Sequence, residues 1–461
     1  MREPAHYLKS LAASFLLAAA VACAATAPEA APAPSSLAPA AEAAGAPAPA
    51  ADKTFDALEA SASGKGFTQA GLVALDAAMA AAVDDGAVKG ISTLLVKDGH
   101  VAHYYEHGIM RAADQAPIKE DTIFRIYSMS KPITGVALMT LYEQGAFSLD
   151  DPITKFVPEF ADLKVLKGVD EDGKMIVEDM DHVPTMRELM SHTAGFGYGL
   201  GGDDPVNTAF REQGVLASPD LDTYIPKVAG IPLLFQPGSN WSYSTAVDIQ
   251  GYIVQKISGK PFGEYLEETI FTPLGMTDTA FFVPEEKRDR FSDVFTHSPE
   301  TGELVPLDDP RFAYREGAFG MEAGGHGLVS TLADYARFCQ MLVDGGELNG
   351  TRILKPETVK LMRTNVLPET FHLFSDGNSV NPERAGHGFG LDFGVLVDPA
   401  PTGTLMPTGT YYWGGAAGTW FWIDPVNDLF FIGMVQVFPA GSMDNAFRKE
   451  SGDLVYEALA K

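Results

Sequence analysis

Two apolar stretches near the C-terminus constrain the fold more than any other feature of the chain. Residues 418–423 and 429–435 are nearly continuous runs of apolar and aromatic side chains, and the five residues between them include Pro425 and Asn427. Continuous apolar runs of this length are typical of strands that are buried on both faces of a sheet. The sequence therefore predicts two central strands close to the end of the chain.

A second strand pair is predicted near the other end. Residues 91–96 and 101–105 are separated by Asp98-Gly99, a dipeptide that tolerates the positive φ angles of a tight turn. Helices are expected from about Thr68 and through residues 447–459. Because strands and a helix are predicted at both ends of the chain, we expect the strands from the two ends to share one sheet. A chain of 461 residues is longer than a single hydrophobic core usually supports, so the middle of the chain is expected to form a second lobe.

The first 52 residues are expected to comprise an export signal and a linker. Arg2 and Lys9 precede an apolar run that is too short to span a bilayer, and residues 1–22 are typical of a signal peptide. Two interpretations stay open, a free periplasmic protein and a bacterial lipoprotein anchored through a lipid on Cys23. Residues 23–52 are rich in Ala and Pro, which predicts an extended linker ahead of a folded domain over 53–461.

Charge and cysteine content narrow the possible partners. The chain has 61 acidic and 33 basic residues, a formal net charge of −28, which repels nucleic acid. Only Cys23 and Cys339 are present, so no intramolecular disulfide is expected in the mature chain, and Cys339 is expected to be buried in a helix. No motif has metal-ligand spacing, and neither a metal nor a cofactor is expected. The oligomeric state stays open.

Ser128 and Lys131 form a Ser-x-x-Lys motif where an apolar, strand-like stretch leads into a predicted helix. Unpaired amides and the helix dipole at a helix N-terminus favour an oxyanion beside Ser128. Three residues later on a helix is the same face, so Lys131 is expected beside the serine hydroxyl. A serine needs a base to become a nucleophile, and an enclosed Lys131 can be that base because burial disfavours the ammonium charge. Alone, the motif also fits a solvated lysine on a surface helix.

Together with this motif, two further stretches resemble the serine β-lactamase and penicillin-binding-protein superfamily. Residues 189–196, Leu-Met-Ser-His-Thr-Ala-Gly-Phe, are similar to its Leu-Leu-Ser-His-Thr-Ser-Gly-Leu segment, and residues 327–335 are similar to its Gly-Leu-x-Ser-Thr-x-x-Asp-Tyr stretch. The class C β-lactamase-like branch, and within it the family VIII carboxylesterases, is the most similar. The resemblance implies an α/β fold in which a mixed antiparallel sheet is flanked by helices (about 66–127 and 323–461), plus a mostly helical lobe (about 128–322).

The resemblance also implies a catalytic tyrosine. The second motif of the branch is Tyr-x-Asn, and Tyr243-Ser244-Thr245 occupies the corresponding place. Tyr243 is then the acid/base partner of Ser128, although without the resemblance it is an ordinary buried tyrosine ahead of a helix. Thr245 replaces the asparagine with which β-lactamases hold the acylamide carbonyl of their substrates.

The third motif departs further from the β-lactamase pattern, because Trp413-Gly414-Gly415-Ala416 replaces Lys-Thr-Gly. A lysine would pair with a substrate carboxylate, whereas an indole offers stacking and one N–H donor without charge. Family VIII esterases are similar in carrying tryptophan there, which favours neutral or apolar acyl substrates. The resemblance implies that the amides of Ser128 and Ala416 form the oxyanion hole, and that substrate contacts come from Trp413, Gly414, Gly415 and Thr245.

Other chemical signals in the sequence favour structural roles. Residues 197–202 match G-x-G-x-x-G but follow a predicted helix, so a loop is expected there instead of a dinucleotide site. His192 is expected in a structural turn because the chain has no G-x-S-x-G motif. His326 and His387 lie between glycines and are candidates for approaching the site.

These observations predict an exported serine hydrolase that cleaves small carboxylic esters through an acyl-enzyme on Ser128. The first alternative is a β-lactamase or D-Ala-D-Ala carboxypeptidase, against which the absent Lys-Thr-Gly lysine argues. The second is a non-catalytic, penicillin-binding-like lipoprotein, against which the presence of Ser128, Lys131 and Tyr243 argues. The expected partner is a small-molecule ester or amide.

Overall fold

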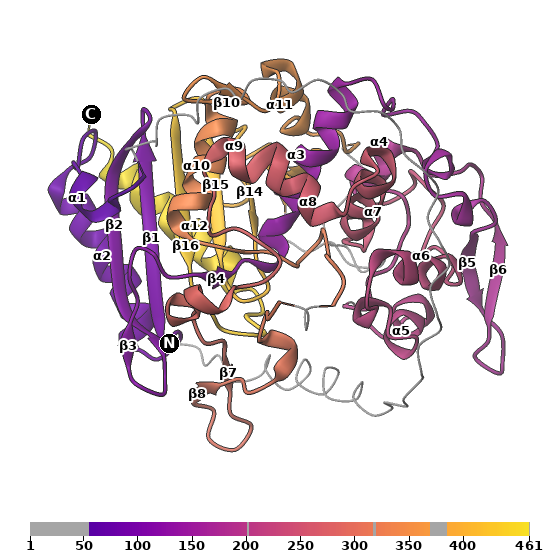
Figure 1. Cartoon of the computed structure of the whole chain (residues 1–461), viewed down its shortest axis with the longest axis horizontal. Coiled ribbons are helices and arrows are strands. Elements are labelled where there is room, and N and C mark those ends of the chain that lie inside the picture. The colour runs from indigo at the N-terminus through magenta and orange to yellow at the C-terminus, as the bar shows by residue number, and fades with distance from the viewer. Residues whose placement is uncertain (1–54, 201, 317–319, 369–384, 461) are drawn as a thin grey trace, which may run out of the picture.

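The computed structural model describes residues 55–200, 202–316, 320–368 and 385–460 (Figure 1). The predicted signal peptide, the linker and Cys23 lie outside these ranges. Within them, no helix combines the length and the apolar character that crossing a bilayer requires.

One eight-stranded sheet organises the molecule, and every neighbouring pair in it is antiparallel. In spatial order its strands are β12 (His387–Phe389), β13 (Gly394–Leu396), β14 (Tyr411–Gly414), β15 (Trp420–Asp424), β16 (Leu429–Met434), β1 (Gly90–Lys97), β2 (His100–Arg111) and β3 (Ala116–Pro117). β16 pairs with β1 in a register that places Ile432 opposite Leu94, which confirms that the two ends of the chain share one sheet. All residues of β15 and β16 are buried, as their apolar runs predicted.

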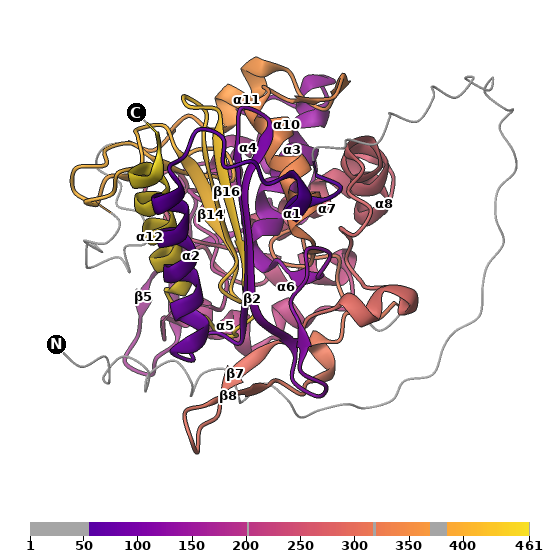
Figure 2. The ribbon, with the colours of Figure 1, turned by 90° about the vertical axis from the view of Figure 1, so that its left-hand side faces the viewer.

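Helices cover both faces of the sheet (Figure 2). α2 (Gln69–Asp84) and α12 (Met443–Ala458) lie side by side on one face, while α10 (Leu332–Val343) and α3 (Ser130–Glu143) lie on the other. A Cβ atom at Gly71 would lie 2.3 Å from the Cβ of Ala458, so a glycine is needed where α2 and α12 approach. On the sheet, the indole N–H groups of Trp420 and Trp422 donate to the Ser451 hydroxyl of α12 at 3.1 and 3.2 Å.

The middle of the chain supplies the second group of helices (Figure 1). These are α4 (Met186–Met190), α5 (Pro205–Glu212), α6 (Leu221–Ala229), α7 (Ala246–Ser258), α8 (Phe262–Leu266) and α9 (Thr272–Leu274). α3 packs against α7, so the helix that follows Ser128 connects the sheet to this helical group. Two hairpins that the sequence did not predict also occur here, β5 (Lys164–Val169) with β6 (Met175–Asp179) and β7 (Phe295–His297) with β8 (Leu304–Pro306).

Short elements complete the described fold. They include α1 (Leu58–Ser61), α11 (Pro356–Met362), β4 (Phe124–Arg125) paired with β9 (Val329–Ser330), and β10 (Glu347–Leu348) paired with β11 (Thr351–Arg352). Phe55 and Leu58 are each only 1% exposed, and Phe55 contacts Phe430 of the sheet. Folded structure therefore begins ahead of the helix that was predicted to start near Thr68.

Local sequence chemistry explains several boundaries. Thr68 and Thr331 cap α2 and α10 by accepting backbone N–H groups, and Thr185 forms a complete capping box with Glu188 at α4. Asp98 and Gly99 have φ angles of 51° and 72°, as a tight turn between β1 and β2 requires. Cys339 is fully buried in α10, which confirms the expectation.

Candidate active site

The segment that carries Ser128 makes a sharp turn between a strand and a helix. β4 is followed by a 3-10 turn over Tyr127–Met129, and α3 begins at Ser130. Tyr127 adopts a φ of +42°, a conformation that costs a non-glycine residue on the order of 1–3 kcal/mol. Its buried ring stacks on Phe438, with centroids 5.4 Å apart. This packing supports a strained turn that leaves Ser128 half-buried at the entrance to the helix.

Two polar groups converge on the Ser128 hydroxyl. The Lys131 amine donates to Ser128 Oγ at 3.2 Å, and the Tyr243 hydroxyl donates to the same oxygen at 2.7 Å. Lys131 is only 1% exposed, so the amine is enclosed by protein, not directed into water. The structure thus brings together the three residues that the sequence singled out, from the start of α3 and from the segment just ahead of α7.

Lys131 has further oxygen contacts and, among the described residues, no carboxylate within ion-pair distance. Its amine donates to the Gly325 carbonyl at 2.8 Å and to the Tyr198 hydroxyl at 3.3 Å. The nitrogen also lies 4.5 Å from the ring centroid of Tyr243. Acceptors on several sides fix the direction in which the amine points, and one of those acceptors is the Ser128 hydroxyl.

Aromatic rings hold Tyr243 in place. Trp413 of β14 contacts it on one side, with ring centroids 5.5 Å apart, and His192 contacts it at 5.2 Å. Trp241 stacks nearly parallel to it, at 6.4 Å, and Tyr198 meets it edge-on at 5.4 Å. Because the phenol ring is packed on several sides, its hydroxyl is held in a fixed position relative to Ser128 Oγ.

The end of β14 lies against the turn that carries Ser128. A Cβ atom at Gly415 would lie 2.5 Å from the carbonyl oxygen of Ile126 and 2.2 Å from the Thr419 hydroxyl, so only glycine allows this approach. Ala416 follows and is exposed, while its carbonyl accepts the N–H of Ala440. This approach sets the Ala416 segment beside the turn that carries Ser128, as an oxyanion hole built from the amides of Ser128 and Ala416 requires.

Thr245 and Gly414 have their own neighbours. The fully buried Thr245 hydroxyl contacts Tyr224 and also donates to Asp248 at 3.3 Å. Gly414 lies against Asp444 of α12, because a Cβ atom there would be 2.3 Å from Asp444 Oδ2. The Thr245 side chain is thus engaged within the protein, at the position where the resemblance implied a substrate contact.

Tyr198 is a site residue that sequence reasoning missed. It lies in the segment 197–200, which is neither helix nor strand, as expected, and its backbone N–H donates to Asn207 Oδ1 at 2.9 Å. Burial raises the pKa of the Tyr198 phenol well above its usual value, so the hydroxyl that contacts Lys131 stays neutral. The flanking Gly197 and Gly199 are the available signal, because they let the backbone approach α5 closely.

The histidines occupy supporting positions. His192 is fully buried with a φ of +59°, and its Nδ1 lies 2.9 Å from the Ser244 hydroxyl. Burial and the nearby Lys131 charge lower its pKa well below the usual value, so the ring is neutral. His387 Nδ1 lies 2.5 Å from the Tyr412 hydroxyl, and His326 Nδ1 lies 3.6 Å from Asp248. Across the described ranges, no group of three or more His, Cys, Asp or Glu residues is arranged to hold a metal ion.

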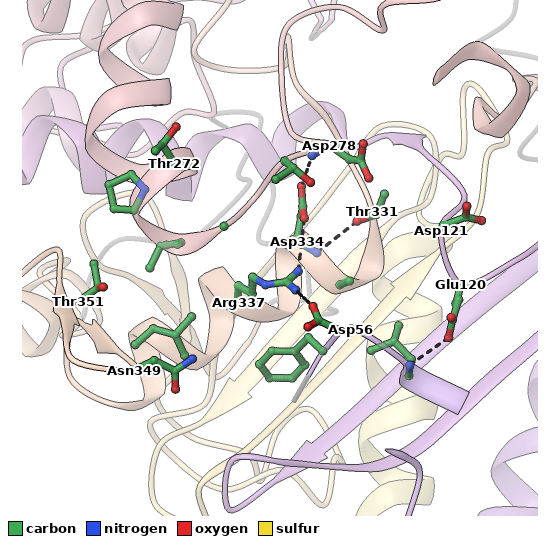
Figure 3. A pocket seen from close by; sticks show the side chains of 18 residues that line it. Asp56, Glu120, Asp121, Thr272, Asp278, Thr331, Asp334, Arg337, Asn349 and Thr351 are labelled. Atoms are coloured by element: carbon green, nitrogen blue, oxygen red, sulfur yellow. Dashed lines mark hydrogen bonds and ion pairs between the residues drawn. The ribbon is translucent and has the colours of Figure 1, made fainter. Parts of the chain in front are cut away.

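A separate cavity of about 460 Å³ lies beside the N-terminal end of α10 (Figure 3). Arg337 extends into it and pairs with Asp56 at 2.6 Å and with Asp334 at 3.5 Å. Burial raises the pKa of Asp334 to about 6. The residues that line this cavity do not include Ser128, Lys131 or Tyr243, so it is distinct from the candidate active site.

Comparison with known proteins places this geometry in context. Residues 75–451 match the family model described as Beta-lactamase. Protein Rv1367c of Mycobacterium tuberculosis is 34% identical over 371 residues, which cover 79% of this chain and 89% of the relative. Esterase EstB of Burkholderia gladioli is 29% identical over 367 residues, 75% of this chain and 86% of the relative. The solved structure of EstCE1, a hydrolase with promiscuous acyltransferase activity, superposes with a TM-score of 0.70 at 25% identity, covering 84% of this chain and 99% of EstCE1.

Proposed function

The chain belongs to the β-lactamase family, and from this premise we propose that it is a serine hydrolase that cleaves carboxylic esters, with Ser128 as its nucleophile. One observation carries the proposal: the enclosed Lys131 amine and the Tyr243 hydroxyl both contact Ser128 Oγ. A nucleophile with a base and a second proton carrier in hydrogen-bond contact is the arrangement that acyl transfer needs.

The reaction proceeds in two steps. Ser128 Oγ loses its proton to the Lys131–Tyr243 pair and attacks the ester carbonyl, and the amides of Ser128 and Ala416 stabilise the resulting oxyanion. The bond to the alcohol oxygen then breaks, and the alcohol leaves with a proton that the pair returns. A water molecule attacks the acyl-enzyme in the same way and releases the acid. Each oxyanion donor contributes about 10²–10³ to the rate in enzymes of this type.

Trp413 favours esters of small neutral or apolar acids over substrates that carry a carboxylate. It lies against Tyr243 and brings no positive charge to the end of β14, so a β-lactam or peptide carboxylate finds no lysine partner at this position. The Thr245 side chain is engaged by Asp248 and Tyr224. The relatives EstB and EstCE1, named as an esterase and a hydrolase, support the same assignment.

The test compares two chromogenic substrates, p-nitrophenyl butyrate and a chromogenic cephalosporin, with Ser128→Ala as the control. The expected result is efficient hydrolysis of the butyrate ester that Ser128→Ala abolishes, with little or no hydrolysis of the cephalosporin. Efficient turnover of the cephalosporin alone would instead identify the protein as a β-lactamase.

We also propose that the protein is exported from a bacterial cell and reaches either the periplasm or a membrane anchor. The apolar run that follows Arg2 and Lys9, with Cys23 just behind it, supports export and leaves both destinations possible. The intact mass of protein purified from a bacterial host decides between them. A lipid adduct on an N-terminal Cys23 identifies a lipoprotein, cleavage without an adduct identifies a free periplasmic protein, and an uncleaved N-terminus contradicts export.

A further inference from the structure

A buried carboxylate lies behind the candidate active site. Asp248 is in the first turn of α7, five residues after Tyr243, and its side chain is fully buried. One of its oxygens, Oδ1, accepts the backbone N–H of Gly325 at 2.9 Å, and the other accepts the Thr245 hydroxyl at 3.3 Å. The His326 ring stands 3.6 Å from the same carboxylate. None of the reaction steps above uses this group.

The peptide unit that Asp248 binds is held from its other end as well. The carbonyl of Gly324, which belongs to the same peptide unit as the Gly325 N–H, accepts the hydroxyl of Thr134 at 2.8 Å. Thr134 is on α3, three residues after Lys131, and is fully buried. Side chains from α3 and α7 thus hold the Gly324–Gly325 peptide between them, which fixes its plane.

The next carbonyl along the chain connects this peptide to the catalytic amine. The Gly325 oxygen accepts the Lys131 amine at 2.8 Å, which is shorter than the 3.2 Å contact between the amine and Ser128 Oγ. A rotation of the Gly324–Gly325 peptide would therefore move the acceptor that aligns Lys131.

Close packing explains why positions 324 and 325 are both glycines. A Cβ atom at Gly325 would lie 3.0 Å from both carboxylate oxygens of Asp248 and from the Tyr198 hydroxyl, and one at Gly324 would lie 2.5 Å from the carbonyl oxygen of Val247. Only a backbone without side chains fits between α3, α7 and the Tyr198 loop.

We propose that Asp248 is a positioning residue that holds the Lys131 amine against Ser128 through the Gly324–Gly325 peptide, with Thr134 holding the same peptide from α3. The inference rests on the proposed serine hydrolase function and adds to it a residue other than Ser128, Lys131 and Tyr243. Hydrogen bonds to a buried carboxylate are stronger than those between neutral groups, so Asp248 is suited to this task. A small displacement of a catalytic group lowers kcat more than it weakens the binding of the substrate.

The experiment measures kcat and KM for p-nitrophenyl butyrate in Asp248→Ala, Asp248→Asn and Thr134→Val, with thermal unfolding of each variant. Asp248→Ala is expected to lower kcat about 100-fold while KM stays within about threefold. Asp248→Asn keeps an oxygen that accepts the Gly325 N–H, so it should retain kcat within about tenfold of the wild type. Thr134→Val should lower kcat about tenfold, again with little change in KM.

Asp424→Asn is the matched control. Asp424 is also a fully buried carboxylate that accepts backbone N–H groups, those of Val426 at 2.8 Å and Asn427 at 3.3 Å, but it serves the turn between β15 and β16. The Asp424→Asn variant should have a lower unfolding temperature than the wild type and an unchanged kcat.

Wild-type kcat in folded Asp248→Ala and in Thr134→Val would overturn the proposal, as would a loss of kcat in Asp424→Asn equal to that in Asp248→Ala. Where Asp248→Ala does not fold, Asp248→Asn and Thr134→Val decide by the same kcat criterion. Ser128→Ala separates this outcome from failure of the proposed function. If Ser128→Ala remains active, the proposed function fails; if it is inactive while Asp248→Ala and Thr134→Val behave as the wild type, only the positioning role fails.

Discussion

The ring of Trp413 packs against the ring of Tyr243, with centroids 5.5 Å apart and planes inclined by 46°. Through this contact, a residue of the central sheet supports the phenol whose hydroxyl donates to Ser128 Oγ at 2.7 Å. The indole therefore orients a proton carrier, and we propose that the 7% of its surface that stays exposed offers the substrate an uncharged contact.

Trp413→Ala should weaken the binding of longer acyl chains. Because the indole also supports Tyr243, kcat is expected to fall for every ester, while the lost apolar contact should raise KM for p-nitrophenyl hexanoate about tenfold and KM for the acetate ester less. Steady-state kinetics across an acyl series measures the effect. Trp422→Phe is the control, because the Trp422 indole binds Ser451 in the core. An equal rise of KM for every chain length would show that Trp413 does not select the acyl group.

Tyr243→Phe should impair chemistry with little effect on substrate binding. The substitution keeps the packed ring and removes only the hydroxyl that contacts Ser128, so kcat is expected to fall about 10²–10³-fold at nearly constant KM. Tyr252→Phe is the control, since Tyr252 is buried in α7, the helix that follows Tyr243, and its ring contacts Lys256. A kcat within twofold of the wild type would remove Tyr243 from the mechanism.

Asp392→Asn should stabilise the protein, and more so at higher pH. Asp392 is buried, Gln250 donates to its Oδ1 at 2.9 Å, and among the described residues its Oδ2 has no hydrogen-bond partner. Burial raises the pKa of Asp392 well above the value of an unfolded chain. Because the folded pKa is the higher one, ionisation favours the unfolded chain as pH rises above the unfolded value, near 3.9.

The amide variant carries no such penalty. We expect its free energy of unfolding to exceed that of the wild type by about 1 kcal/mol at pH 8 and by clearly less at pH 4. Urea unfolding at both pH values measures the difference. A variant whose stabilisation is the same at pH 4 and pH 8 would contradict the assignment of a raised pKa.

Ser451→Ala should destabilise the core without changing the active site. The variant leaves the indole N–H groups of Trp420 and Trp422 without their shared acceptor, which is expected to cost about 2 kcal/mol of unfolding free energy. Chemical denaturation checks this, with the exposed Ser239→Ala as the control, where a change below about 0.5 kcal/mol is expected. Equal stability of the two variants would show that the serine does not anchor α12 on the sheet.

Sequence patterns predicted the parts of the fold that local chemistry determines. The apolar runs became β15 and β16, Asp98-Gly99 became the turn between β1 and β2, and the helix expected from about Thr68 became α2. The two additional hairpins escaped prediction because their strands are short or largely exposed and lack a clear alternation of apolar and polar side chains.

The same distinction applies to the candidate site. Ser128 and Lys131 are three residues apart, so helical geometry alone placed them together. Tyr198 and Gly325 contact Lys131 from 67 and 194 residues away, and Asp248 acts through Gly325. Only the tertiary structure brings these groups to the amine, because a local pattern such as Gly197 and Gly199 indicates a close approach of the backbone but not the group that is approached.

The most direct test of the proposed mechanism is the mass of the acyl-enzyme. The protein is mixed with excess p-nitrophenyl acetate, quenched in acid within the first turnovers, and analysed by intact-protein mass spectrometry and peptide mapping. A single acetyl adduct on the peptide that contains Ser128, absent from Ser128→Ala, is the predicted result. An adduct on a different residue, or undiminished ester hydrolysis by Ser128→Ala, would contradict the assignment of Ser128 as the nucleophile.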